Sequence, residues 1–177
     1  MNKVHYSSRS NEWATPQWLF DKLNERFGPF TLDAAATAGN AKCPLYFTAE
    51  DDGLSRDWSG HTVFLNPPYG RAIAKWVKKA HDESANGATV VCLIPARTDT
   101  SYWHDYIFGK ADVLFLRGRI KFEGPDGSPN SAPFPSAVVV FRPEHHRAGR
   151  RHPCIMQMDD RAAAFYLVPG DPALRNL

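Results

Sequence analysis

The chain lacks the features that mark membrane and secreted proteins. No apolar run approaches the roughly 20 residues that a membrane helix needs. The first residues, MNKVHY, contain no apolar core followed by small residues, so we expect no signal peptide. Cysteine is scarce: Cys43, Cys92 and Cys154 are far apart and form no CxxC pair, which argues against a disulfide framework. We therefore expect a cytoplasmic protein with no membrane partner.

An excess of one charge and a metal-binding pattern are also missing. The 21 Lys and Arg residues nearly balance the 19 Asp and Glu residues, so the net charge of +2 does not by itself indicate a nucleic-acid partner. His145, His146, His152 and Cys154 lie near one another but lack the paired cysteine spacing of a structural zinc site. We expect no metal, and any basic surface must come from local clustering of Lys and Arg.

The length bounds the number of domains. With 177 residues, 43% of them hydrophobic, the chain can bury one sizeable core but has no room for a second full domain. Residues 1–142 are predicted to form the main domain. Residues 143–177 are interpreted as a basic linker and C-terminal extension packed on the same domain. The run from Arg142 to His152 carries four arginines and three histidines and is a candidate phosphate-binding arm.

Predicted strands and helices alternate along the chain. Thr15 followed by Pro16 is typical of a helix start, and an apolar stripe continues to Gly28. Strands are predicted at 30–32, 63–65, 89–94, 113–116 and 137–141, helices from residue 73 and over 99–108, and a hairpin-like stretch near 118–124. This order predicts an α/β fold, mostly parallel, with an antiparallel addition near the C-terminal side. Asp33 and Asn66 each follow a strand, where such sheets bind ligands.

The most informative motif is Asn66-Pro67-Pro68-Tyr69. A conjugated amino nitrogen is a poor nucleophile, and hydrogen-bond acceptors can make its lone pair available. The Asn66 side-chain oxygen and a carbonyl of the Pro67-Pro68 segment could each accept one amino hydrogen, and the two prolines would hold that carbonyl in place. Tyr69 would stack on an extruded base. The alternative interpretation is a turn that ends a strand.

These residues belong to a larger set of segments. Together they resemble the small phage-type DNA N6-adenine methyltransferases of the Dam family over roughly residues 11–142, and the order and spacing carry the resemblance. The segments are NEWATP from residue 11, LDAAA from 32, DDGL from 51, DW at 57, LNPPYG from 65, PARTDT from 95, GRIKF from 118 and PFPS from 133.

The resemblance implies a trimmed, Rossmann-like sheet that uses S-adenosylmethionine to methylate N6 of a flipped adenine in double-stranded DNA. It implies cofactor contacts for Thr15 and Pro16. It also implies that Asp33, with Ala34 and Ala35 after it, receives the methionine end of the cofactor. Asp57 becomes a candidate for the cofactor's adenine or ribose.

Some features leave alternatives open. Asp51 and Asp52 compete with Asp57, although an acidic turn ending at Gly53 explains them equally well. The usual glycine-rich cofactor loop is replaced by residues 34–40, which contain one glycine. Only residues 34–65 separate Asp33 from Asn66, so we expect a reduced sheet. No insertion is long enough for a separate target-recognition domain, which leaves DNA readout to loops.

Basic and aromatic residues supply the remaining candidates. Arg97 is the strongest candidate for DNA contact, followed by Arg119 and Lys121, whose alternation with Ile120 and Phe122 also fits the solvent face of a strand. We interpret Trp18, Trp76 and Trp103 as core residues. Trp13, in an apparent loop, could close over the cofactor or the base.

Other functions stay open on these motifs. An RNA or protein-glutamine methyltransferase could use the same Asn-Pro-Pro-Tyr turn, and a cytosine amino-methyltransferase is a close competitor in which serine commonly replaces the asparagine. A degenerate domain that only binds DNA is the non-enzymatic alternative, favoured by the glycine-poor loop and opposed by the intact motif. The sequence sets no oligomeric state.

Overall fold

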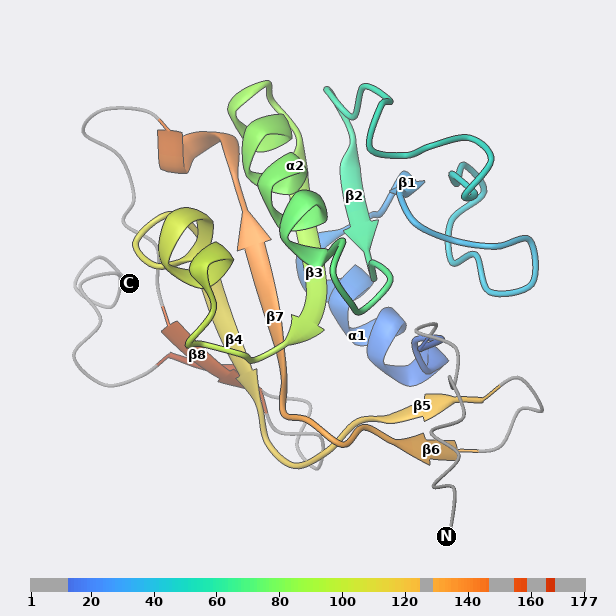
Figure 1. Ribbon diagram of the computed structural model, residues 1–177, viewed down its shortest axis with the longest axis vertical. Coiled ribbons are helices and arrows are strands. Elements are labelled where there is room, and N and C mark those ends of the chain that lie inside the picture. Colours follow the sequence, from blue (N-terminus) through green and yellow to red (C-terminus); the bar gives the residue numbers. More distant parts are fainter. Residues whose placement is uncertain (1–12, 125–128, 147–154, 159–164, 168–177) are drawn as a thin grey trace, which may run out of the picture.

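The computed structural model describes residues 13–124, 129–146, 155–158 and 165–167. Within them the elements begin with helix α1 (Gln17–Phe27), strands β1 (Leu32–Asp33) and β2 (Thr62–Leu65), helix α2 (Ile73–Ala85) and strand β3 (Thr89–Pro95) (Figure 1). They continue with a π-helical turn η1 (Trp103–Ile107), strands β4 (Asp112–Leu116), β5 (Lys121–Glu123), β6 (Pro129–Ser131) and β7 (Ser136–Phe141), and a 3-10 turn η2 (Pro143–His146). Strands β8 (Ile155–Met158) and β9 (Phe165–Leu167) complete them.

Seven of these strands form one mixed sheet in the order β1-β2-β3-β7-β4-β8-β9. Strands β1, β2 and β3 are parallel to one another, and β8 is parallel to β4. The predicted α/β class, with a parallel part and an antiparallel part, is therefore confirmed. The division into a domain of residues 1–142 and an extension stays a prediction, although β8 pairs directly with β4.

Of the two antiparallel strands described in this sheet, β9 pairs with β8 at the edge and β7 lies inside. Strand β7 is inserted between β3 and β4 and is antiparallel to both. All six of its residues are buried, since Ala137–Phe141 is a continuous apolar run that suits a strand covered on both faces. Its position joins the early and late halves of the chain into one core.

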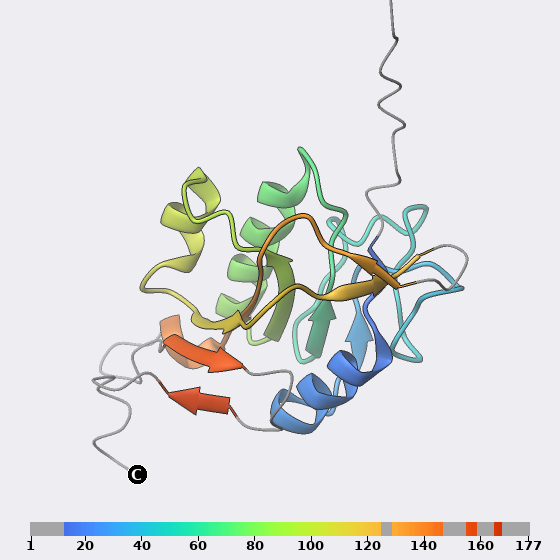
Figure 2. The ribbon, with the colours of Figure 1, turned by 90° about the horizontal axis from the view of Figure 1, so that it is seen from below.

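Helices cover both faces of the sheet. Helix α1 lies on one face, while α2 and η1 lie on the other (Figure 2). Helix α1 packs through Leu19, Phe20, Leu23 and Phe27. The prediction that Trp18 belongs to the core is wrong: its side chain is 42% exposed, and Lys22 Nζ lies 5.4 Å from its ring centroid. Trp18 precedes the buried stripe by one residue, which turns it about 100° away from Leu19.

Two other predicted elements differ in detail. The helix expected over residues 99–108 is shorter and its regular part is the π-helical turn η1, with Trp103 fully buried as predicted. The hairpin-like stretch is confirmed as an antiparallel pair of β5 and β6, which pairs Phe122 with Asn130. This hairpin lies apart from the main sheet, beside the start of α1 (Figure 1).

Candidate active site

The two motif-bearing strands end side by side. Strand β1 ends at Asp33, which is in register with Phe64 of the parallel strand β2, and Asn66 follows β2 directly. The backbone continues this pairing, since Ala34 N donates to Phe64 O at 3.1 Å. Asp33 and Asn66 therefore lie at the carboxyl edge of adjacent parallel strands, where ligands bind in such sheets.

Asn66 is held by the segment that precedes α1. Its Nδ2 donates both to the Trp13 carbonyl and to Thr15 Oγ1, the latter at 3.0 Å. Its Oδ1 is shielded from solvent and has no hydrogen-bond partner in the structure. The carbonyl of Trp13 can only accept, so it fixes which end of the amide is the nitrogen. Asn66 Oδ1 is therefore a hydrogen-bond acceptor that is fixed in orientation and has no donor.

The rest of the Asn-Pro-Pro-Tyr turn is well anchored. Pro67 is buried and Pro68 is exposed. The Tyr69 hydroxyl donates to Leu93 O at 3.1 Å, and burial raises the pKa of Tyr69 well above its ordinary value. Its ring is only 6% exposed and packs edge-on against Phe134, with centroids 5.5 Å apart. Stacking of Tyr69 on a base stays a prediction and would need one face of this ring to open.

Asp33 is a buried carboxylate with one free oxygen. Oδ2 accepts from the Lys42 backbone N–H at 2.9 Å, whereas Oδ1 has no partner. Burial raises the pKa of Asp33 to about 6, and the hydrogen bond from Lys42 offsets part of that rise. A cation bound beside Oδ1 would relieve the cost of burying this charge.

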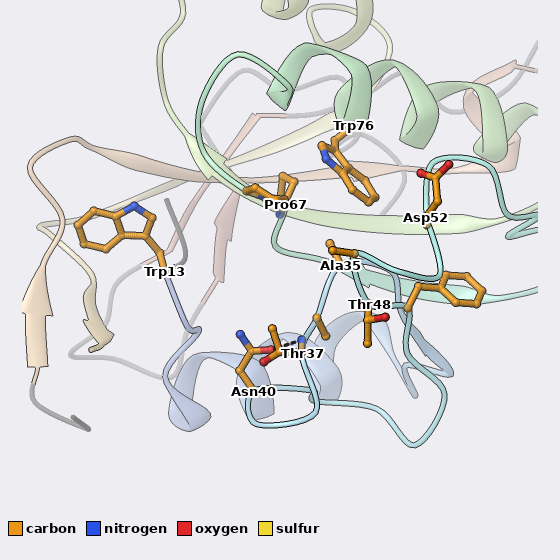
Figure 3. Close-up of a pocket in the computed structure, with 13 residues that line it drawn as sticks. Trp13, Ala35, Thr37, Asn40, Thr48, Asp52, Pro67 and Trp76 are labelled. Atoms are coloured by element: carbon orange, nitrogen blue, oxygen red, sulfur yellow. Dashed lines mark hydrogen bonds between the residues drawn. The ribbon is translucent and has the colours of Figure 1, made fainter. Parts of the chain in front are cut away.

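A cavity of about 270 Å³ opens beside this edge, close to the lower end of the range for small-molecule sites. Figure 3 shows Trp13 and Asp52 at opposite ends of it, with Pro67 and Trp76 along its wall. The lining residues come from four parts of the chain: Trp13; Ala35, Ala36, Thr37, Asn40, Phe47, Thr48 and Ala49; Asp52 and Gly53; and Pro67, Pro68 and Trp76.

The loop between β1 and β2 builds most of this wall. Ala36 N donates to Phe47 O at 2.9 Å, and Phe47 N donates back to Asp33 O at 3.0 Å, so the loop folds alongside β1. Asn40 Oδ1 accepts from Thr37 N at 2.7 Å and closes the turn between them. The small side chains of Ala35 and Ala36 line the cavity without filling it, as the glycines of the usual glycine-rich cofactor loop would. Sequence reasoning missed Phe47, because no periodic pattern marks a loop residue of this kind.

The three candidate acids occupy different positions. Asp51 accepts from the Thr48 backbone and hydroxyl, and those bonds lower its pKa. Asp57 accepts from Ser59 in the same way and is not among the residues that line the cavity. Asp52 lines the cavity and has a positive φ of 50°. The assignment of Asp57 to the cofactor stays a prediction, while its competitor Asp52 faces the space available for a ligand.

Gly53 explains why the acidic segment is followed by glycine. A Cβ atom at this position would lie 2.3 Å from the Ala34 carbonyl oxygen and 3.1 Å from the Trp76 ring. The Gly53 carbonyl accepts from the Trp58 indole N–H at 3.0 Å, and Trp58 stacks on Trp76. Trp76 is thus a core residue, as predicted, and also part of the cavity wall.

Aromatic and basic residues surround the approach to Asn66. The Trp13 ring lies edge-on to Phe122 and Phe134, with centroids 5.5 and 5.6 Å away. The exposed Arg97 guanidinium lies 6.0 Å from the Phe134 centroid. Arg119 and Lys121 are exposed, while Ile120 and Phe122 between and beside them are buried, which is the alternation of a half-buried strand. Their predicted DNA contacts stay open.

The basic C-terminal run is only partly described. Arg142 Nε donates to the buried Asp112 at 3.1 Å, and His145 lies 3.5 Å from the same carboxylate, so the start of the run packs on the fold. Residues 147–154, with His152 and Cys154, lie outside the described part. Within the part of the chain that the structure describes, no cluster of three or more His, Cys, Asp or Glu could hold a metal. None of the described helices is long and apolar enough to cross a bilayer.

Comparison with known proteins identifies relatives. Residues 3–161 match the family described as DNA N-6-adenine-methyltransferase (Dam). A DNA N-6-adenine-methyltransferase of Escherichia phage T1 is 31% identical over 117 residues, which cover 66% of this chain and 48% of that protein. One of Haemophilus phage HP1 is 27% identical over 138 residues, covering 75% of this chain and 79% of that protein. The match thus spans about half the length of the phage T1 relative and most of the phage HP1 relative.

The family match extends beyond the segments that suggested the resemblance, on both sides of residues 11–142. It includes both strands that end at the candidate site and the loop that forms the cavity wall. The chain belongs to the DNA N-6-adenine-methyltransferase (Dam) family.

Proposed function

We propose that this chain transfers a methyl group from S-adenosylmethionine to N6 of an adenine flipped out of double-stranded DNA. The observation that carries the proposal is the Asn66 side chain, whose Oδ1 is buried without a donor while its Nδ2 is already engaged. A buried acceptor of this kind is costly unless a ligand supplies the missing hydrogen. The adenine amino group is such a donor.

Asn66 acts on the amino group together with the backbone after it. One N6 hydrogen is donated to Asn66 Oδ1 and the other to a carbonyl of the Pro67-Pro68 segment. Two fixed acceptors favour a pyramidal nitrogen, whose lone pair then points away from them towards the methyl donor. S-adenosylmethionine, held beside Asp33, would supply the methyl group: a nitrogen–carbon bond would form as the sulfonium–carbon bond breaks, S-adenosylhomocysteine would leave, and one N6 proton would pass to solvent.

The residues of the cavity fit the methyl donor. S-adenosylmethionine supplies an electrophilic methyl group and carries a sulfonium and an ammonium. The open Oδ1 of Asp33 is a counter-charge for these cations, and Ala34 and Ala35 leave room beside it. Asp52 is our candidate for the ribose hydroxyls, because it lines the cavity at the end opposite Trp13. This arrangement supports a reduced Rossmann-like methyltransferase sheet.

DNA would approach from the side of Trp13 and the β5–β6 hairpin. Arg97 is exposed beside Phe134, and Arg119 and Lys121 are exposed on and before β5. Such side chains contact phosphates or base edges, and phosphate contacts make affinity depend on salt. Because Trp13 packs against Phe122 of β5, the same hairpin is linked to Asn66.

The test is transfer of labelled methyl from S-adenosylmethionine to unmethylated duplex DNA, followed by nucleoside digestion and mass spectrometry. N6-methyladenine is the expected product. Asn66→Ala should abolish transfer and leave the cofactor dissociation constant within about twofold, while Asn86→Ala, at an exposed site beyond α2, should match the wild type. Turnover by Asn66→Ala would remove this residue from the mechanism. Cofactor binding without labelled DNA would favour an RNA or protein substrate, or a module that only binds DNA.

A further inference from the structure

We propose that Thr15 is a positioning residue for the catalytic amide of Asn66. The inference rests on the proposed function and gives Thr15 a different task from cofactor contact. Asn66 Nδ2 has two protons, and both are taken by one short segment: the Trp13 carbonyl accepts one and Thr15 Oγ1 accepts the other at 3.0 Å. These partners lie more than 50 residues away in the chain.

The two partners have different effects on the amide. A carbonyl oxygen can only accept, so turning the amide by 180° would place Asn66 Oδ1 against the Trp13 carbonyl and repel it. A hydroxyl can accept or donate, so Thr15 does not choose the orientation. Thr15 instead gives the second N–H its partner inside a buried site, which stops the amide from rotating away from the orientation that Trp13 sets. Adenine then meets an acceptor and not a competing donor.

The surroundings of Thr15 favour this role over cofactor binding. Thr15 is 3% exposed and is not among the residues that line the cavity, whereas Trp13 is. Its neighbour Ala14 accepts from Glu123 N of β5 at 3.0 Å, and the Trp13 ring packs on Phe122 of the same strand. Residues 13–15 thus connect the β5–β6 hairpin to the side chain that receives the base.

Two variants separate the hydroxyl from the shape of the side chain. Thr15→Val keeps the volume and removes the acceptor, so we expect kcat to fall roughly three- to tenfold, the effect of losing one ordinary hydrogen bond. The dissociation constant for S-adenosylmethionine should stay within about twofold. Thr15→Ser restores the acceptor and should recover most of kcat. A thermal melt of each variant reports whether the fold is retained.

A second readout does not depend on turnover. The side-chain NH2 resonances of Asn66, assigned by their loss in Asn66→Ala, should shift in Thr15→Val and stay close to wild type in Thr15→Ser. Unchanged resonances in Thr15→Val would overturn the inference.

Kinetics distinguish the other outcomes. If the wild type methylates DNA and Thr15→Val has the same kcat, the positioning role of Thr15 is overturned and the proposed function stands. A cofactor affinity that falls in Thr15→Val, with kcat retained at saturating cofactor, would assign Thr15 to the cofactor instead. A wild-type chain that binds cofactor and never methylates DNA would overturn the proposed function, and the positioning role would fall with it.

Discussion

Replacing Asp33 by asparagine should stabilise the protein at neutral pH while weakening cofactor binding. Burial raises the pKa of Asp33 from 3.8 to about 6, so the folded protein resists ionising this carboxyl more than the unfolded chain does. The penalty is absent below the unfolded pKa, grows as the pH rises through the interval between the two values, and is complete above the folded pKa.

The size of the effect follows from those two pKa values. A rise of about 2 units costs about 3 kcal/mol of unfolding free energy at pH 7.5, and only about 1 kcal/mol at pH 4.5, where the unfolded carboxyl is mostly ionised and the folded one is not. Asparagine removes the charge and keeps an acceptor for the Lys42 N–H. Asparagine places an NH2 group where aspartate has its unpaired oxygen, so a buried polar group without a partner remains and the charge accounts for most of the difference.

Urea unfolding of wild type and Asp33→Asn at the two pH values measures this directly. The variant should gain up to about 3 kcal/mol at pH 7.5 and lose most of that advantage at pH 4.5. Asp57→Asn is the matched control, because hydrogen bonds from Ser59 lower the pKa of that exposed carboxylate and its removal should give no stabilisation. Calorimetry should show weaker S-adenosylmethionine binding by Asp33→Asn. Equal stability of wild type and Asp33→Asn at pH 7.5 would refute the argument from burial.

Three further substitutions test other parts of the site. Gly53→Ala should lower the unfolding free energy by about 1–3 kcal/mol, because its Cβ would meet the Ala34 carbonyl oxygen at 2.3 Å; an unchanged melting temperature would contradict this close contact. Tyr69→Phe removes the hydroxyl that donates to the Leu93 carbonyl and should lower the unfolding free energy in urea by about 1 kcal/mol. Because burial raises the pKa of Tyr69, this loss should not change with pH below about pH 9. Arg97→Ala should reduce the slope of log affinity against log salt by about one in duplex binding, and an unaltered slope would remove a phosphate contact.

The location of the site follows from local sequence features. Two short apolar runs end in Asp33 and Asn66, and parallel strands bring such ends to one edge. The chain between them is too short for many strands, and β1 and β2 are direct neighbours. Local pattern and sheet geometry were therefore enough to predict which edge holds the candidate site.

The walls of the cavity depend on long-range contacts that no local pattern reveals. The sequence favoured Asp57 over its competitors Asp51 and Asp52, whereas the folded loop turns Asp52 towards the cavity. The positive φ of Asp52 and the close approach of Gly53 to Trp76 accompany this orientation, and both are tertiary effects. The paired backbone hydrogen bonds that bring Phe47 beside the site are likewise invisible in its own neighbourhood of the chain.

Neighbouring positions on a helix limit what an apolar stripe can predict. Trp18 and Leu19 both fit a stripe that continues to Leu23, yet only Leu19 and Leu23 are buried while Trp18 is 42% exposed. The centre of the stripe depends on the rotation of the helix about its own axis, and in the observed rotation Phe20 packs against Phe30 and Phe64. Pattern therefore predicts the helix better than it predicts the boundary of its buried face.

The ends of strands β1 and β2 each carry a buried oxygen without a hydrogen-bond donor, which is unfavourable for stability. Asp33 Oδ1 and Asn66 Oδ1 are, among the described side chains, the buried oxygens without a partner whose usual forms can only accept a hydrogen bond. Each such group costs about 1–3 kcal/mol. A fold selected only for stability would pair them or replace them with apolar side chains. Because they lie at one sheet edge, a cationic methyl donor beside one and an amino group beside the other would satisfy both, so in the proposed function the binding of the two reactants would remove this desolvation cost.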